Sequence, residues 1–387
     1  MPWSKPESIA PGAGICILVS CLLLGCTGSE RTDTSAKDKP PNKLNSSTSS
    51  YKPADSSKQD AFERFDRVEF KKLVHRAEQY RKSGQLDKAA RELELASRLD
   101  AGNVTVELNL AEYYNDRDDY NRAYQHADQA VKLAPGRVEA LLNRAKAAFH
   151  KASISDTEEY EREGLADLKR ALELEPGNSK AHFFMGVWNS EKSSPKEAIK
   201  HYDKAIELDP GVAGYYAYRG MAYGNDGQYG KAIEDMSATL KLQPDRWAQR
   251  FARAEFYEEA GQYQNAFKDY TVIIESGPEV ARARYLRAGL LEKMKDLKGA
   301  VEDYSALIKG DPTDDEALKR RGDVFMKLGE PRRALLDYNA AISLDTDLSV
   351  YYSARAACHE ALGNRDRAAA DRKAAEKAEH RKAIEKL

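Results

Sequence analysis

Arginine recurs at regular intervals along most of this chain, and an acidic residue follows it 16 residues later in six places and 23 residues later in one. A row of guanidinium groups could bind an anion, because each presents several N–H donors in a rigid fork. Where the arginine is replaced, by Leu110 and Met185, the acid is replaced too, by His126 and His201. Residues that change together favour a direct contact, so we expect ion pairs rather than an anion site. The expected pairs are Arg76–Glu92, Arg144–Asp167, Arg219–Asp235, Arg253–Asp269, Arg287–Asp303, Arg321–Asp337 and Arg355–Asp371.

The chain carries none of the motifs that usually indicate catalysis or metal binding. It has no phosphate-binding glycine loop, no paired-cysteine metal motif and no Gly-x-Ser-x-Gly elbow. Its seven histidines are scattered, and no two of them are spaced as His-x-x-x-His. We therefore expect no enzymatic activity, no cofactor and no metal site.

A sequence repeat predicts the helices that hold these charged residues. Five prolines follow one another at intervals of 34 residues: Pro176, Pro210, Pro244, Pro278 and Pro312. Pro135 stands 41 residues before the first of them, so one repeat carries an insertion of seven residues. Within each repeat, apolar residues three and four apart predict two amphipathic helices. A fixed period of this length indicates stacked helix pairs, with starts near residues 70, 104, 138, 179, 213, 247, 281, 315 and 349.

These repeats resemble the tetratricopeptide repeat (TPR) family. That family places small or aromatic residues at fixed positions and a proline near the end of each repeat. Repeat four has Gly186, Asn189, Ala198, Tyr202, Ala205 and Pro210 at those positions, and repeat six has Ala254, Tyr257, Ala266, Tyr270, Ile273 and Pro278. Asn189 departs from the usual aromatic, and repeats one, eight and nine lack the proline. The resemblance implies an all-α, right-handed α-solenoid of about nine helix pairs.

The resemblance also implies a partner-binding surface. In the TPR family, positions 2, 5, 9 and 12 of the first helix line a concave face that can hold a peptide or a helix. Carried over to this chain, these positions include Leu142, Phe149, Phe183, Val187, Met221, Phe251, Glu255 and Tyr285. The lysine–asparagine clamp of the chaperone-binding members is not expected, since Lys319 fits but Asp323 and Ala354 do not. A partner contact on the insertion at 151–163 is the alternative interface.

The start of the chain differs from the repeats. The apolar run Ile15–Cys26 is shorter than the roughly 20 residues that span a bilayer, but it suits the core of a secretory signal. It ends in Leu-Leu-Gly-Cys, which resembles the lipobox of bacterial lipoproteins, whose cysteine becomes the lipid-bearing first residue. We expect a signal peptide over 1–25, a lipidated Cys26, a disordered tether over 26–59 and the TPR solenoid over 60–387. Cys21 also fits the lipobox pattern, but less well than Cys26. The alternative to a lipoprotein signal is an ordinary signal peptide.

Composition narrows the class of partner. The chain has 61 Lys and Arg against 63 Asp and Glu, so no excess of positive charge favours nucleic acid. Together the features predict a non-enzymatic scaffold, lipid-anchored in the bacterial cell envelope and facing the periplasm, that binds a protein or peptide. Thr27 after the cysteine favours the outer membrane over the inner one. The alternatives are a recruiting subunit of an enzyme complex that acts on peptidoglycan or glycans, and an assembly factor of outer-membrane or pilus type.

Overall fold

The computed structural model describes residues 56–155, 158–344 and 349–385. The expected signal peptide, Cys26 and the tether up to residue 55 lie outside these ranges. Every regular element within the ranges is an α-helix, and no helix among them is long and apolar enough to cross a membrane.

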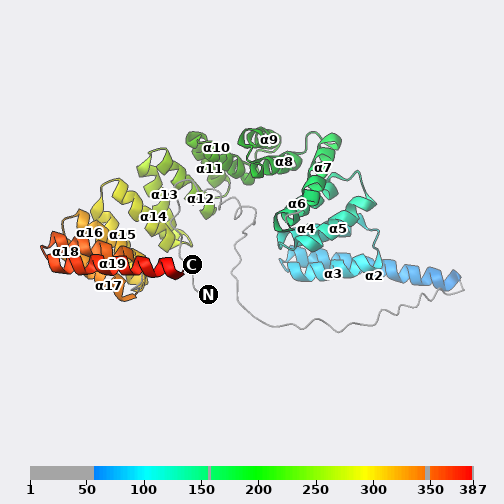
Figure 1. The fold of residues 1–387 in the computed structure, drawn as a ribbon. Helices are drawn as coiled ribbons and strands as arrows, with labels where there is room; N and C mark the ends of the chain where they lie inside the picture. Colours follow the sequence, from blue (N-terminus) through cyan, green and yellow to red (C-terminus); the bar gives the residue numbers. More distant parts are fainter. Residues whose placement is uncertain (1–55, 156–157, 345–348, 386–387) are drawn as a thin grey trace. The chain divides into compact units, whose positions relative to one another are not determined.

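Eighteen helices in the described residues follow one another as nine consecutive pairs (Figure 1). The pairs are α2 (Ser56–Lys82) with α3 (Leu86–Leu99), α4 (Val104–Asp116) with α5 (Tyr120–Leu133), α6 (Val138–Ser155) with α7 (Glu158–Leu174), α8 (Ser179–Glu191) with α9 (Pro195–Leu208), α10 (Ala213–Asn225) with α11 (Tyr229–Leu242), α12 (Trp247–Glu259) with α13 (Tyr263–Ser276), α14 (Val280–Lys293) with α15 (Leu297–Gly310), α16 (Asp315–Lys327) with α17 (Pro331–Leu344), and α18 (Ser349–Ala361) with α19 (Arg365–Glu385). The predicted all-α fold of stacked helix pairs is confirmed.

The helix boundaries follow the repeat closely. Of the eight first helices after α2, seven begin at the expected residue and α14 begins one residue early, at Val280. Helix α2 begins at Ser56, so residues 56–59, at the end of the expected tether, are helical. These residues are polar but include neither Pro nor Gly, so they can extend a helix that apolar residues downstream support.

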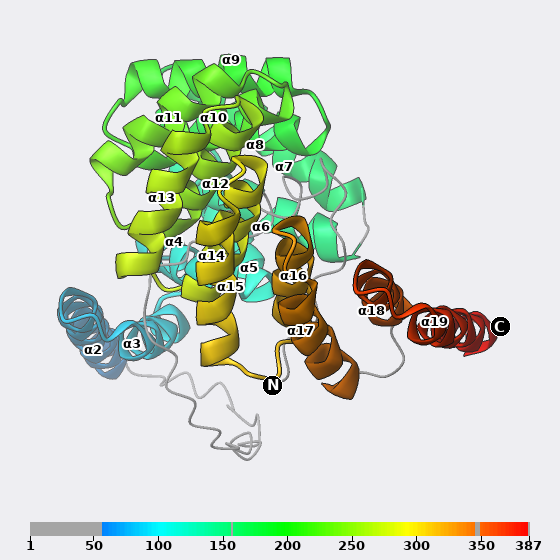
Figure 2. The ribbon, with the colours of Figure 1, turned by 90° about the vertical axis from the view of Figure 1, so that its left-hand side faces the viewer.

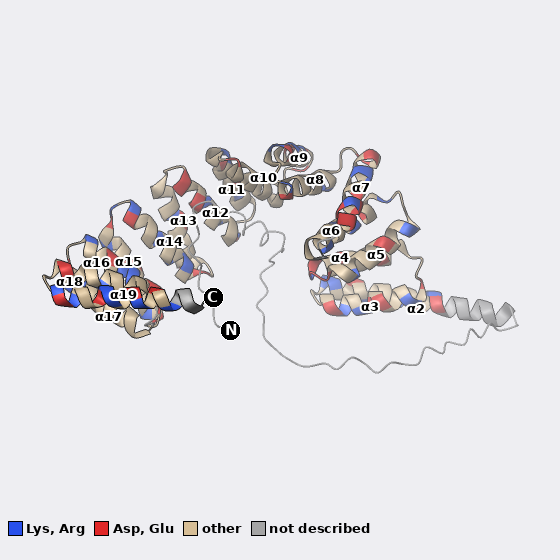
Figure 3. Cartoon of the chain, viewed as in Figure 1, with Lys and Arg blue, Asp and Glu red and all other residues tan. Residues whose placement is uncertain are grey.

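The repeats gather into two compact units. We call them the N-terminal half, up to Pro210, and the C-terminal half, from Gly211. Within each half, successive pairs lie side by side, as α10 to α15 do in Figure 2. Lys and Arg alternate with Asp and Glu along the helices of both halves (Figure 3), which suits wide solvated faces.

The two helices of a repeat approach closely because a small residue on the first faces a tyrosine on the second. A Cβ atom at Gly186 would lie 2.5 Å from Cε1 of Tyr202, and one at Gly322 would lie 2.7 Å from Cε1 of Tyr338. Both tyrosines are fully buried. A side chain at either of these two positions would therefore require the tyrosine ring to shift.

The turn between the two helices needs a residue in the left-handed region. In five repeats this residue is glycine: Gly84, Gly227, Gly261, Gly329 and Gly363. The equivalent residues elsewhere are Asp118, Ser193 and Lys295, with φ angles of 60°, 54° and 66°. A side chain in this region costs about 1 kcal/mol, so these three turns are strained relative to the glycine turns.

The seven-residue insertion lengthens both helices of the third repeat. Helix α6 has 18 residues and α7 has 17, compared with 13 in α4 and 14 in α5. The insertion therefore extends the helix pair at its turn end.

Candidate functional site

The structure brings the arginines and acids into contact inside each repeat. Arg287 donates from Nε to Asp303 Oδ2 and from Nη2 to Asp303 Oδ1, both at 2.7 Å. The side chains of Arg287 and Asp303 are only 15% and 3% exposed. The same contact joins Arg219–Asp235, Arg253–Asp269, Arg321–Asp337, Arg355–Asp371 and, across the insertion, Arg144–Asp167. Arg76 and Glu92 also pair, at 2.8 Å.

Five of these arginines, which lie at interfaces between successive repeats of one half, have a further partner that sequence reasoning missed. Arg287 Nη1 donates to Oγ1 of Thr271, 2.9 Å away on the second helix of the preceding repeat. The equivalent acceptors are Asp128 for Arg144, Ser237 for Arg253, Ser305 for Arg321 and Asn339 for Arg355. Each acceptor lies two residues after the acid of its own repeat. In the second repeat His126 replaces that acid, and Asp128 follows it by two residues. The recurrence of a polar residue at this position was the available signal.

We call the guanidinium, its acid and its acceptor on the preceding repeat an arginine clamp. A clamp connects two repeats through one largely buried arginine. The N–H groups of its guanidinium are hydrogen-bonded to acceptors within the protein. The clamps therefore stabilise the packing and the register of the repeats. They do not form a row of unpaired guanidinium groups that could bind an anion.

Two repeats lack the clamp arginine, and their contacts differ. In the second repeat Leu110 replaces it, and buried Glu107 instead pairs with His126 at 2.7 Å. In the fourth repeat Met185 replaces it, and the Nδ1 atoms of His182 and His201 lie 3.3 Å apart. The interfaces that these repeats form with the preceding ones, α3 with α4 and α7 with α8, are the sparsest between successive repeats within either half. We call them the unclamped seams.

The carboxyl group of Glu107 is held ionised by its neighbours. Burial acts to raise its pKa, but hydrogen bonds from His126 and from Ser97, at 2.7 and 2.5 Å, outweigh burial. The pKa of Glu107 is therefore lowered.

In the N-terminal half, the expected concave strip is partly core. Leu142 and Val187 are only 7% and 8% exposed, so they offer little surface to the partner that they are predicted to bind. Phe149 is half-buried and its ring covers Gly164, whose added Cβ would lie 2.9 Å from Phe149 Cε1. Phe183 is half-buried beside Tyr202, with ring centroids 5.9 Å apart. Only the two phenylalanines keep any surface for binding.

In the C-terminal half, polar groups cover the expected apolar residues. Met221 and Phe251 are 4% and 1% exposed, and the Arg282 guanidinium lies 4.5 Å from the centre of the Phe251 ring. Glu255 is half-buried 3.9 Å from Arg282, and burial raises its pKa. Tyr285 donates to Asp314 at 2.5 Å. Met221 and Phe251 are therefore buried, the surface above them is polar, and their part in binding stays a prediction.

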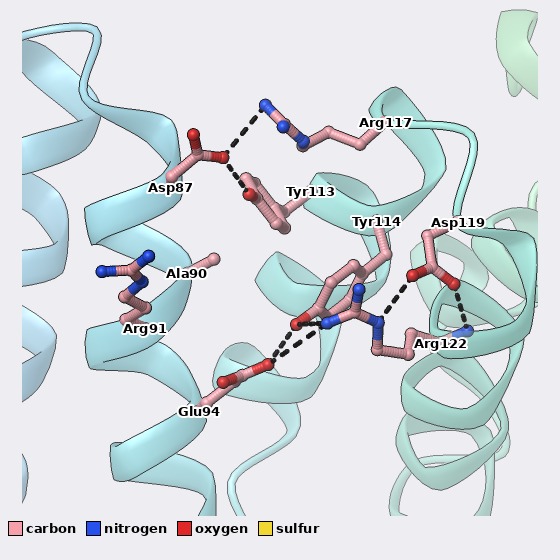
Figure 4. A pocket seen from close by; sticks show the side chains of 9 residues that line it. All are labelled: Asp87, Ala90, Arg91, Glu94, Tyr113, Tyr114, Arg117, Asp119 and Arg122. Carbon is pink, nitrogen blue, oxygen red and sulfur yellow. Dashed lines mark hydrogen bonds and ion pairs between the residues drawn. The ribbon is translucent and has the colours of Figure 1, made fainter. Parts of the chain in front are cut away.

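A pocket of about 440 Å³ in the N-terminal half was not expected from the sequence (Figure 4). It lies between α3, which contributes Asp87, Ala90 and Glu94, and the opposite wall of α4, α5 and their turn. Tyr113 and Tyr114 point toward α3 from that wall. The pocket lies at the first unclamped seam.

Ala90 explains why the pocket is open. At the position that Ala90 occupies in the first repeat, each of the next seven repeats carries a larger side chain. These residues are Tyr124, Leu165, Ile199, Ile233, Phe267, Val301 and Leu335. In the C-terminal half, Phe267 and Val301 pack into the core between successive repeats. The methyl group of Ala90 leaves that volume empty.

Two groups of side chains form the ends of the pocket. At one end, Tyr113 donates to Asp87 at 2.6 Å and Arg117 pairs with the same oxygen at 3.0 Å. At the other end, Tyr114 donates to Glu94, and Arg122 donates to the Tyr114 hydroxyl at 3.0 Å. We call these the Asp87 triad and the Glu94 triad.

The phenols of both triads stay protonated at neutral pH. Burial and the hydrogen bond to Asp87 raise the pKa of Tyr113 to about 12. Burial and the hydrogen bond to Glu94 likewise raise the pKa of Tyr114 to about 12. Both hydroxyls therefore act as fixed donors to their carboxylates.

Comparison with family models identifies TPR repeats in the middle of the chain. Two tetratricopeptide repeat models match, one over residues 201–234 and the other over 219–278 and 269–315. The helix pairs within 201–315 are therefore tetratricopeptide repeats. A search of curated proteins finds no match.

Solved structures of several TPR proteins are similar to this chain. YrrB, described as a TPR protein with an unusual peptide-binding site, has 20% identity and a TM-score of 0.41, over 48% of this chain and 95% of YrrB. A tetratricopeptide repeat protein from Parabacteroides merdae has 17% identity and a TM-score of 0.43, over 75% and 99%. PilF of Pseudomonas aeruginosa has 18% identity and a TM-score of 0.45, over 55% and 93%.

Proposed function

We propose that this chain is a non-enzymatic scaffold that holds a protein or peptide partner of the bacterial cell envelope. The observation that carries the proposal is the array of TPR helix pairs, which fixes many side chains on rigid helices without a large internal core. Such arrays provide long surfaces on which a peptide or a helix can lie.

The surface of repeats six and seven is one place where a partner would contact the array. Arg282, 44% exposed, covers Phe251 and lies beside half-buried Glu255. A partner that draws Arg282 aside gains access to an aromatic ring and a carboxylate together. Charged rims around an aromatic anchor are common in protein interfaces.

The test is cross-linking in cells, purification of the captured partner and measurement of its binding to the purified full chain. We expect Arg282→Glu to weaken binding, because it reverses the charge on this surface. Lys268→Glu makes the same charge change on an exposed part of α13 and is the matched control. Failure to reconstitute binding with any captured protein would contradict the scaffold proposal, and equal effects of the two variants would place the interface elsewhere.

The anchor belongs to the same proposal. The Leu-Leu-Gly-Cys sequence supports cleavage before Cys26, a lipid such as palmitate on that cysteine, and residence on the periplasmic face of the outer membrane. Metabolic labelling with a fatty-acid analogue tests it. Cys26→Ala should abolish labelling while Cys358→Ala leaves it intact, and persistent labelling of Cys26→Ala would place the lipid on another residue.

A further inference from the structure

We propose that His182 of α8 and His201 of α9 bind a divalent transition-metal ion of the class that prefers imidazole nitrogen, such as Zn²⁺. The two histidines are 19 residues apart in the sequence, and the fold of the fourth repeat brings their Nδ1 atoms to within 3.3 Å of each other. The inference goes beyond the proposed function, because the ion would bind whether or not the array holds a partner.

The contact between these two side chains differs in chemistry from its counterparts. In repeats two, six and seven the equivalent residues join an acid to a base, as Glu107–His126, Arg250–Asp269 and Arg284–Asp303. In the fourth repeat both residues are bases. Their contact is longer than the usual N–H hydrogen bond of about 2.9–3.0 Å. Two neutral imidazoles can share only one hydrogen bond here, whereas a metal ion accepts the lone pairs of both.

His182 is held with a lone pair toward His201. Its Nε2 atom lies 3.0 Å from the carbonyl oxygen of Pro176, and a carbonyl only accepts, so Nε2 carries a proton. In the neutral imidazole the lone pair is then on Nδ1, the atom that faces His201. Histidine ligands of metal ions are commonly fixed by a hydrogen bond from the other ring nitrogen to a carbonyl oxygen.

His201 is kept uncharged, as a metal ligand must be. Burial lowers its pKa, and the neighbouring His182 lowers it further. Glu197 and Lys200 of the same helix act on this pKa in opposite directions and pair with each other at 2.7 Å. At neutral pH His201 can therefore carry its proton on Nε2 and present a second lone pair at Nδ1.

The separation of the two nitrogens fits one metal ion. Zn²⁺ binds imidazole nitrogen at about 2.0–2.1 Å in tetrahedral geometry, which places two such nitrogens about 3.3 Å apart. The ring centroids are 5.6 Å apart and would lie about 5.2 Å apart around an ion, so both rings must rotate to aim their lone pairs at it. Both side chains are half-buried, so solvent and an ion can reach them.

The chain supplies only two ligands to this ion. In the part of the chain that the structure describes, no group of three or more His, Cys, Asp or Glu residues is placed to hold a metal. Water would therefore fill the remaining positions. Two of the four ligands of a structural zinc site imply an affinity on the order of 10 μM, and Mg²⁺, which prefers oxygen, should not bind.

The test uses the full chain without an affinity tag and labelled with ¹⁵N-histidine, with the ring nitrogens followed by NMR during titration with ZnCl₂ near neutral pH. We expect the Nδ1 resonances of His182 and His201 to shift together and saturably, and to return when EDTA removes the ion. An equal titration with MgCl₂ should leave both unchanged. The absence of a saturable Zn²⁺ shift at both residues would overturn the inference, and so would an equal response to Mg²⁺.

His201→Gln is the deciding variant, because glutamine keeps a hydrogen-bonding group of similar reach but lacks the imidazole. We expect it to weaken Zn²⁺ binding at His182 by about tenfold or more, while its circular dichroism spectrum matches that of the native chain. His182→Gln, followed at His201, is the reciprocal variant. His380→Gln removes an exposed imidazole of α19 and is the matched control, which should leave the response at His182 unchanged.

A native response of His182 in the His201→Gln variant would show that the two residues do not share one ion, and would overturn the inference. The shift is measured at the two histidines themselves, so zinc bound by cysteines or by other histidines of the chain does not count toward it.

Discussion

The Asp303→Ala variant offers the sharpest test of how the array is held together. Asp303 is buried and accepts from Arg287 at two points and from Arg284 at 2.9 Å. Removal of the carboxylate leaves the Arg287 guanidinium, 15% exposed, without its counter-charge. Breaking a buried ion pair in this way costs about 3–5 kcal/mol. Because Thr271 still accepts from Arg287 and water reaches part of the group, we expect the lower limit, about 3 kcal/mol.

Amide hydrogen exchange is the appropriate assay, because an array of repeats loses stability locally. A loss of about 3 kcal/mol should accelerate exchange of the most protected amides of α14 and α15 by about two orders of magnitude. Glu302→Ala, at an exposed position next to Asp303, is the matched control and should change stability by no more than about 0.5 kcal/mol. The double variant Arg287→Met/Asp303→Leu should recover most of the loss, since it removes both charges and fills the space.

An acceleration of less than about fivefold in Asp303→Ala, which corresponds to about 1 kcal/mol, would show that the Arg287 charge does not need its partner. A double variant less stable than Asp303→Ala would show that the cost does not come from an uncompensated charge.

Three further predictions concern the turn, the helix contact and pH. Lys295→Gly should raise the free energy of unfolding by about 1 kcal/mol in denaturant titrations, because it relieves a left-handed φ of 66°, and a loss of stability would contradict this. Gly186→Ala should lower it by about 1–3 kcal/mol, since the new methyl group meets the Tyr202 ring, and an unchanged midpoint would show that the ring moves freely. Burial and Lys146 lower the pKa of His150 to about 4, below its unfolded value of about 6.5, so its contribution to stability is complete above about pH 6.5 and is lost toward pH 4. His150→Phe should therefore lose less stability than the native chain between pH 7 and 4.5, and equal losses would refute this role.

The helix pairs could be predicted because their determinants recur within the sequence. Ala198 and Tyr202 indicate how one pair of helices packs, and the residues 34 positions later indicate the same packing in the next pair. The arginine–acid contacts were accessible for the same reason, since Leu110 and Met185 each occur with the loss of the acid. Repetition supplies several independent instances of one contact, and a contact that varies as a pair can be recognised.

The binding surface could not be predicted in the same way. The periodicity of a helix shows which residues share a face, but it does not show which neighbour covers them. Phe251 lies at a concave position of its own repeat, yet Arg282 of the next repeat covers its ring. Met221 is likewise buried. Whether a side chain of the next repeat covers a residue depends on the distance between the repeats, which the sequence of a single repeat does not show.

The pocket escaped prediction because a small residue defines it. Ala90 is an unremarkable residue in a helix, and its effect depends on the side chains that surround the same space in other repeats. Tyr113 and Tyr114 read as ordinary aromatic residues until α3 is placed opposite them.

The two unclamped seams have a mechanical consequence. Within the N-terminal half, a clamp ties α5 to α6, whereas α3–α4 and α7–α8 have none, so this half should be stiff at the clamped joint and compliant at the other two. Thermal bending of the N-terminal half should concentrate at these two joints.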